Sequence, residues 1–144
     1  MKKFFILCIG IFISQAIAAA QTEQIEVTNA YVRGLPPGVE NTAAYMTLHN
    51  TGSEDLVLTG GEADFAESVS IHASENNNGM MGMVHKMNLI IPAGEQVVLE
   101  SGGLHLMLSG LKRPLGDEEV SLTLKFQKGM TLTLRLPVIS VLDE

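Results

Sequence analysis

Polar and apolar positions alternate in short segments along this chain, and no segment after residue 21 has a helical period of useful length. The apolar and β-branched runs are short and are separated by turns rich in Gly, Asn, Pro and Asp, which is typical of strands. About nine short strands at this spacing indicate an all-β domain, an antiparallel sandwich or barrel with Greek-key connections. We predict strands at Ile25–Arg33, Ala43–His49, Leu56–Thr59, Ser68–His72, Met81–Ile90, Glu95–Leu99, Leu104–Leu108, Glu119–Phe126 and Thr131–Val138.

The first twenty residues differ in character from the rest. Lys2 and Lys3 precede an apolar run from Phe4 to Ile13, and small residues follow in Ala16–Ala20. This layout is typical of a secretory signal peptide and is too short for a spanning helix. We expect cleavage after Ala18 or Ala20 and an exported protein, with no stable membrane insertion afterwards. A lipoprotein acylated at Cys8 is the weaker alternative, because Cys8 lies inside the apolar run. No linker, repeat or charge block divides residues 21–144, so we expect a single domain there.

Charge and cysteine content limit the chemistry of the mature chain. In the full sequence, nine Lys and Arg stand against sixteen Asp and Glu, for a net charge of −7, and the loss of Lys2 and Lys3 with the leader makes the mature chain more acidic still; no basic cluster is present. A nucleic-acid partner is therefore not expected. Cys8 is the only cysteine of the sequence and would leave with the leader. Any metal site of the mature chain must then use His, Met or carboxylate ligands.

Strand alternation separates two histidines and a methionine from the core. In the segment Leu104–Leu108 the three leucines share one face, and His105 and Met107 share the other. In the same way His72 points away from Val69 and Ile71. Three donors suited to a soft metal therefore lie opposite the apolar face.

Four residues form the candidate metal site, namely His72, Met83, His105 and Met107. Thioether and imidazole donors suit Cu(I), a soft ion, and discriminate against hard cations. His72 and Met83 flank an Asn-rich turn that ends in Gly79, so a hairpin would bring them near each other.

The residue pattern also allows a plainer interpretation of Met83, because methionine is most often core filler. Met83 shares its parity with Leu89 and Ile91, as an ordinary buried face would. The two interpretations agree if Met83 lies at the open end of the strand and Leu89 and Ile91 lie deeper. Accessory or competing ligands would come from the same parity: Met81, His85 and Met87. We interpret His49 as a surface turn residue.

The spacing of the four donors resembles a known signature. Ten residues separate His72 from Met83, twenty-one separate Met83 from His105, and one separates His105 from Met107. This spacing matches the H-x10-M-x21-H-x-M pattern of the PCuAC-type periplasmic copper chaperones. The neighbouring sequences agree over nearly the whole mature chain. They are Thr42–Leu48 followed by Asn50-Thr51-Gly52, then Ile91–Gly94, Gly103–Leu108 and Gly110-Leu111. One departure is Ser74, where many relatives carry another Met, so an accessory thioether would have to come from Met80, Met81 or Met87.

The resemblance implies a cupredoxin-like sandwich that binds one Cu(I) per chain at an exposed site made by the four donors. It also implies a monomer without enzymatic activity that passes copper to an accepting protein, a cytochrome oxidase subunit or a Sco-type thiol protein. Whether Cu(II) also binds is left open. Transfer would proceed by ligand exchange, because thioethers are weak and labile donors.

Other functions fit the sequence less well. A blue-copper electron carrier needs a Cys thiolate, which the mature chain lacks. Copper buffering or tolerance without a dedicated recipient would use the same ligands, and only transfer assays would separate it from delivery. A metal-independent adhesion module does not explain the ligand spacing, and no nucleophile or carboxylate pair indicates a hydrolase.

Overall fold

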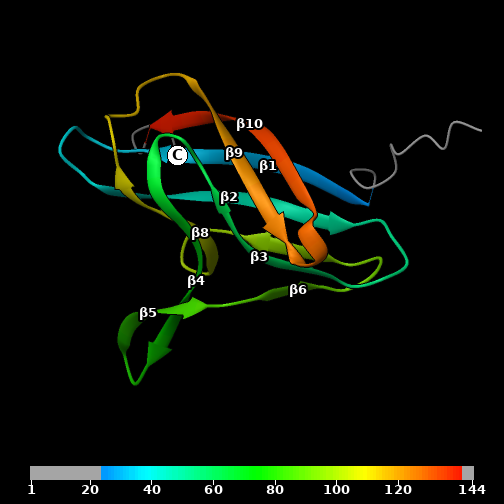
Figure 1. Cartoon of the computed structure of the whole chain (residues 1–144). Helices are drawn as coiled ribbons and strands as arrows, with labels where there is room; N and C mark the ends of the chain where they lie inside the picture. Colours follow the sequence, from blue (N-terminus) through cyan, green and yellow to red (C-terminus); the bar gives the residue numbers. More distant parts are fainter. Residues whose placement is uncertain (1–23, 141–144) are drawn as a thin grey trace, which may run out of the picture.

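A computed structural model describes residues 24–140, and within that range the chain is all-β with a single turn of 3-10 helix (Figure 1). Ten strands follow one another along the sequence. Their bounds are β1 Ile25–Gly34, β2 Asn41–Asn50, β3 Leu56–Glu62, β4 Ala66–Asn77, β5 Met80–Lys86, β6 Leu89–Ile91, β7 Gln96–Leu99, β8 Leu104–Leu111, β9 Glu119–Phe126 and β10 Thr131–Ser140, with η1 at Gln127–Gly129.

The strands pair in the order β5-β4-β8-β2-β1-β10-β9-β3-β6, and β7 adds to β2. A further pairing between β3 and β4 joins the two ends of this sheet, so seven strands from β4 round to β3 form a closed barrel. Among the described strands every pair but one is antiparallel, as the sequence predicts. The exception is β1 with β10, which run parallel.

Two glycines allow the barrel to close. Gly60 has a φ of 141°, and Gly61 lies opposite Val69 at the β3–β4 contact. A Cβ on Gly61 would come within 2.6 Å of the Thr123 carbonyl oxygen on β9. The backbones of three strands therefore approach here as only glycine permits.

The core fills the barrel with the inward residues of the alternating strands. Leu106 and Leu108 on β8 and Ile71 on β4 are fully buried, so the predicted direction of their faces is confirmed. Other fully buried side chains of this core are Val32, Leu48, Leu58, Ile91, Leu122 and Leu124.

The predicted strand Met81–Ile90 is wrong in one respect, because it is two strands in different places. β5 pairs with β4 through a hairpin, whereas β6 pairs with β3. Asn78 and Gly79 at the hairpin turn both have positive φ, 54° and 84°, which is the conformation of a tight hairpin turn. The β4–β5 hairpin projects from the barrel, and β5 forms an outer edge of the sheet (Figure 1).

None of the helical turns in residues 24–140 is long and apolar enough to span a bilayer. The predicted signal peptide and its cleavage sites lie outside the described residues.

Candidate metal centre

Three histidines form a row across the outer face of β5, β4 and β8. His72 on β4 lies directly opposite His105 on β8 and, on its other side, directly opposite His85 on β5. The His72 ring centroid is 6.0 Å from that of His105 and 5.3 Å from that of His85, and both ring pairs are stacked. The predicted proximity of His72 and His105 therefore follows from strand register.

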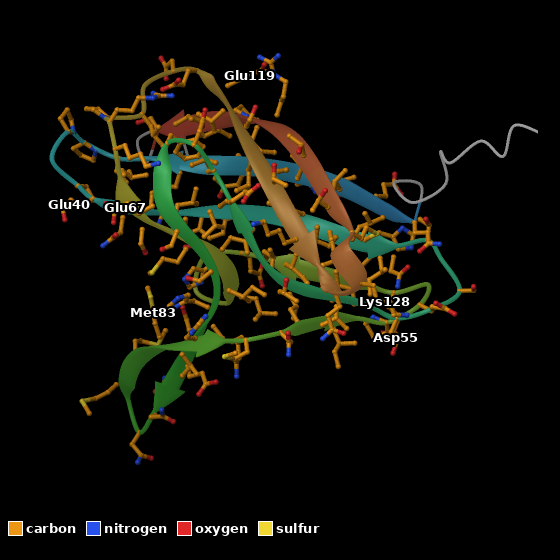
Figure 2. All side chains as sticks on the ribbon, viewed as in Figure 1. Glu40, Asp55, Glu67, Met83, Glu119 and Lys128 are labelled. Carbon is orange, nitrogen blue, oxygen red and sulfur yellow. The ribbon has the colours of Figure 1, made fainter. Side chains whose placement is uncertain are left out.

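The two predicted methionine ligands lie on either side of this row. Met107 is opposite Ser70 on β4, and Met83 is opposite Ser74, two residues the other way from His72. Met83, Met107 and His105 nevertheless line one cavity of about 240 Å³. Figure 2 shows the Met83 side chain extending from β5 toward the body of the barrel.

Hydrogen bonds define which ring nitrogens are available to a metal. His105 Nδ1 lies 3.0 Å from the Gly103 carbonyl oxygen, which can only accept, so Nδ1 carries the proton and Nε2 keeps its lone pair. His72 Nε2 lies 3.0 Å from Ser70 Oγ, whereas His72 Nδ1 is buried with no hydrogen-bond partner. An Nε2–H that donates to Ser70 leaves a lone pair on that unpartnered Nδ1. A metal ion would satisfy it.

The surroundings of His72 favour its neutral form. Partial burial, with His85 and His105 as positive neighbours when protonated, lowers the pKa of His72 below its usual value. Neutral imidazole is the form that coordinates a metal. Among the described residues that line the cavity, Arg33 is the only charged one, although the chain as a whole is strongly acidic. Carboxylate oxygens, which hard cations need, are missing from this lining.

Histidines and carboxylates alone do not gather into a metal site in the described part of the chain. Within residues 24–140 no group of three or more His, Cys, Asp or Glu side chains gathers closely enough to hold a metal ion. The row of histidines explains this, because His85 and His105 lie on opposite sides of His72. A site here combines imidazole with thioether, a donor set that suits Cu(I).

Tyr45 closes the far side of His105. Tyr45 is buried, and its ring centroid lies 6.5 Å from that of His105 and 5.3 Å from that of Tyr31, with both ring pairs tilted. The Arg33 guanidinium lies over the Tyr45 ring at 5.8 Å. This packing holds His105, which is only 4% exposed, in one orientation.

Met83 is not a core residue, so the core interpretation of this residue is wrong. It is 60% exposed, and Met80, Met81 and Met87 are more exposed still. Burial of one such side chain contributes about 1.5–3 kcal/mol, and none of these residues gains that in full. Ile91, of the same parity, is fully buried as expected, but it lies on β6 and not deeper along the strand that carries Met83.

The remaining predicted residues divide between the site and the surface elsewhere. Met81 and His85 share the outward face of β5 with Met83, and Met87 follows the strand end. His49 lies within β2 rather than in a turn, is half-buried, and its Nδ1 is 3.4 Å from Glu26 Oε2. Another cavity, of about 360 Å³ between Gly34–Pro36 and Leu115–Asp117, contains no His or Met.

Sequence reasoning missed the supporting residues Ser70 and Tyr45. Ser70 shares the outward face of β4 with His72, and that parity is visible in the sequence. Tyr45 becomes a neighbour of His105 only through the pairing of β2 with β8, which no local pattern specifies.

Comparisons with known proteins agree on one family. The family model described as "Putative lipoprotein LpqE-like" matches residues 25–138. The protein "Putative lipoprotein Lxx21020" of Leifsonia xyli subsp. xyli is 36% identical over 120 residues, which cover 82% of this chain and 71% of that protein.

Solved structures agree in fold. The solution structure of CuI-DR1885 from Deinococcus radiodurans is 35% identical, with a TM-score of 0.69 over 90% of this chain and 87% of that one. The apo-DR1885 solution structure is 34% identical, with a TM-score of 0.65 over 99% and 96%. The copper-bound PCuAC domain from PmoF2, at 19% identity, has a TM-score of 0.69 over 81% of this chain and 93% of that domain. The expected cupredoxin-like, PCuAC-type fold is therefore confirmed.

Proposed function

The chain belongs to the LpqE-like family and is of the PCuAC type, and on this premise we propose that it is a copper chaperone that binds one Cu(I) through His72, Met83, His105 and Met107. The related DR1885 protein has been solved with Cu(I). Copper is the cargo of this protein and not a catalytic cofactor.

One observation carries the proposal. Met83, Met107 and His105 line the same cavity, and His72 faces His105 in register with an unpartnered buried nitrogen. Two imidazoles and two thioethers form a neutral donor set, so a bound Cu(I) keeps a single positive charge. Such a site favours Cu(I) over Zn(II), whose usual ligands are Cys, His and carboxylate.

The exposure of Met83 supports delivery of copper to a partner protein. Met83 lies on an edge strand that projects from the barrel and is largely open to an approaching protein. A Cys or His of the recipient would bind the copper while some of the original ligands still hold it. The thioethers would be displaced more readily than the imidazoles, because they are weaker donors.

The recipient that we propose is a copper centre of cytochrome oxidase or a Sco-type thiol protein. We also propose that the protein acts in the periplasm as a monomer after cleavage following Ala18 or Ala20. The names of its relatives, putative lipoproteins, agree with export. Intact mass spectrometry of the secreted protein tests the cleavage site and would reveal an acylated Cys8 instead.

Copper loading of the mature chain tests the proposal. Native mass spectrometry under anaerobic, reducing conditions should find one Cu(I) per chain. The variant His105→Asn with Met107→Leu should lose it, whereas the matched variant His49→Asn with Met80→Leu should keep it. Equal retention in both variants would contradict the assigned ligands.

A further inference from the structure

The β5 strand carries two metal donors, Met81 and His85, that the four-ligand site does not use. Met81, Met83 and His85 occupy alternate positions of β5, and in register they lie beside Asn76, Ser74 and His72 of β4. These three side chains therefore share the outward face of the sheet with the histidine row. Met81 and Met83 are 67% and 60% exposed.

His85 competes with His105 for the same neighbour. The His85 ring is 5.3 Å from His72, which is closer than the 6.0 Å between His72 and His105. His85 and His105 lie on opposite sides of β4, and no three histidines in the described chain converge on one point. A metal ion at this face can therefore share His72 with one of them at a time.

We propose that β5 provides a second, exposed position for Cu(I), made by Met81, Met83 and His85 beside His72, through which copper enters and leaves the cavity site. The proposal rests on the proposed function and adds a path to it. Met83 and His72 stay bound during the step. Nε2 of His105 and the sulfur of Met107 dissociate, and a ring nitrogen of His85 and the sulfur of Met81 replace them. The oxidation state of copper does not change, and no proton needs to move between neutral donors.

This arrangement explains why soft donors lie on the outer edge of the sheet. His105 is 4% exposed and packed beneath Tyr45, so a partner protein cannot easily reach copper at that ligand. The outward side chains of β5 are open. Moving the ion by one strand would expose it to an incoming thiolate or imidazole.

Kinetics separate a path residue from a resident ligand. The dissociation constant Kd for Cu(I) is the release rate constant divided by the loading rate constant. A residue that acts only along the path changes both constants by the same factor and leaves the affinity unaltered. A resident ligand changes the affinity itself.

The experiment compares wild type with the variant Met81→Leu, His85→Asn. Stopped-flow absorbance measures Cu(I) transfer to and from a chromophoric chelator, and equilibrium competition with the same chelator measures affinity. The control variant, Met80→Leu with His49→Asn, changes an exposed Met on the opposite face of β5 and a distant His. Thermal melts of the apo proteins check that both variants fold.

We expect both rate constants of the β5 variant to fall by about tenfold or more and its Kd to stay within about threefold of wild type. The control variant should match wild type in all three quantities. Slowing of less than about threefold would overturn the proposed path. A Kd raised by more than about tenfold would also overturn it, because Met81 or His85 would then be a resident ligand. Two other results would instead contradict the proposed four-ligand site. One is a wild-type protein that binds no Cu(I), and the other is an undiminished affinity for Cu(I) in the variant His105→Asn, Met107→Leu.

Discussion

From the hydrogen bond between Ser70 and His72 we predict which ring nitrogen of His72 binds copper. The variant Ser70→Ala removes the hydroxyl 3.0 Å from His72 Nε2 and leaves the ring otherwise in place. If His72 coordinates through Nδ1, copper makes the remaining Nε2–H a stronger donor. That donor loses its partner in the variant, and the affinity for Cu(I) should fall.

The size of the effect follows from the nature of the bond. Partners of metal-bound histidines typically contribute about 10–100-fold in affinity, most strongly when they are carboxylates. Ser70 is neutral and the bond is only partly buried, so a net contribution of about 1 kcal/mol applies. We therefore expect Kd for Cu(I) to rise about five- to tenfold, which is about 1–1.4 kcal/mol.

The assay is competition with a chromophoric Cu(I) chelator at neutral pH. Ser68→Ala is the matched control, because Ser68 is an exposed residue two positions along the same face of β4. Long-range proton–nitrogen NMR of the apo protein should show the proton of His72 on Nε2 and that of His105 on Nδ1. Unchanged affinity in Ser70→Ala, or a His72 proton on Nδ1, would refute the assignment of the ligand atom.

Further predictions concern the metal, the fold and pH. Zinc at a concentration comparable to Cu(I) should not displace it, because thioethers suit Cu(I) and offer little to Zn(II); displacement in a competition titration would contradict the donor set. The apo protein should already be folded by circular dichroism, and free Cu(I) at 100 times Kd should add about 2.7 kcal/mol and raise Tm by about 10 °C; a disordered apo spectrum would contradict this. Cu(I) affinity should fall at low pH as imidazole protonates, with the onset for His72 below about 6.5 because its pKa is lowered in the fold. Replacing His72 and His105 by Met should flatten the pH dependence of the Cu(I) affinity. The variant Met83→Leu with Met107→Leu should bind Cu(I) more weakly but keep the same pH dependence. His49→Ala should change neither the affinity nor its pH dependence. In the apo protein the same lowered pKa means that the unfolded chain binds the His72 proton more readily, so stability should decline as pH falls below about 6.5; His72→Asn should decline less in urea unfolding, and an equal decline would be inconsistent with the shift.

Local patterns were sufficient to predict the faces of the strands. The two-residue period of Leu104–Leu108 placed His105 and Met107 outside the core, and the buried leucines confirm that direction. The Asn-Gly turn likewise predicted the hairpin that carries Met83, because its backbone requires positive φ. The four-donor spacing predicted the PCuAC-type family, which the family model and the solved structures confirm.

Long-range pairing could not be predicted from the sequence. The same two-residue period runs through Met81–Ile90, so nothing local shows that β5 pairs with β4 and β6 with β3. Register between distant strands determines which residues line the cavity, namely His105, Met83 and Met107. It also brings Tyr45 beside His105. The parallel β1–β10 pair and the closure of the barrel at Gly61 are set in the same way.

X-ray absorption spectroscopy of the Cu(I)-loaded mature protein tests the central claim most directly, because copper–sulfur and copper–nitrogen scattering differ. At one copper per chain we predict a Cu(I) edge with two sulfur and two nitrogen neighbours. The variant Met83→Leu, Met107→Leu should lose the sulfur contribution, and Met80→Leu should retain it. A wild-type spectrum with nitrogen and oxygen neighbours alone, or sulfur scattering that survives the loss of Met83 and Met107, would contradict the assigned site.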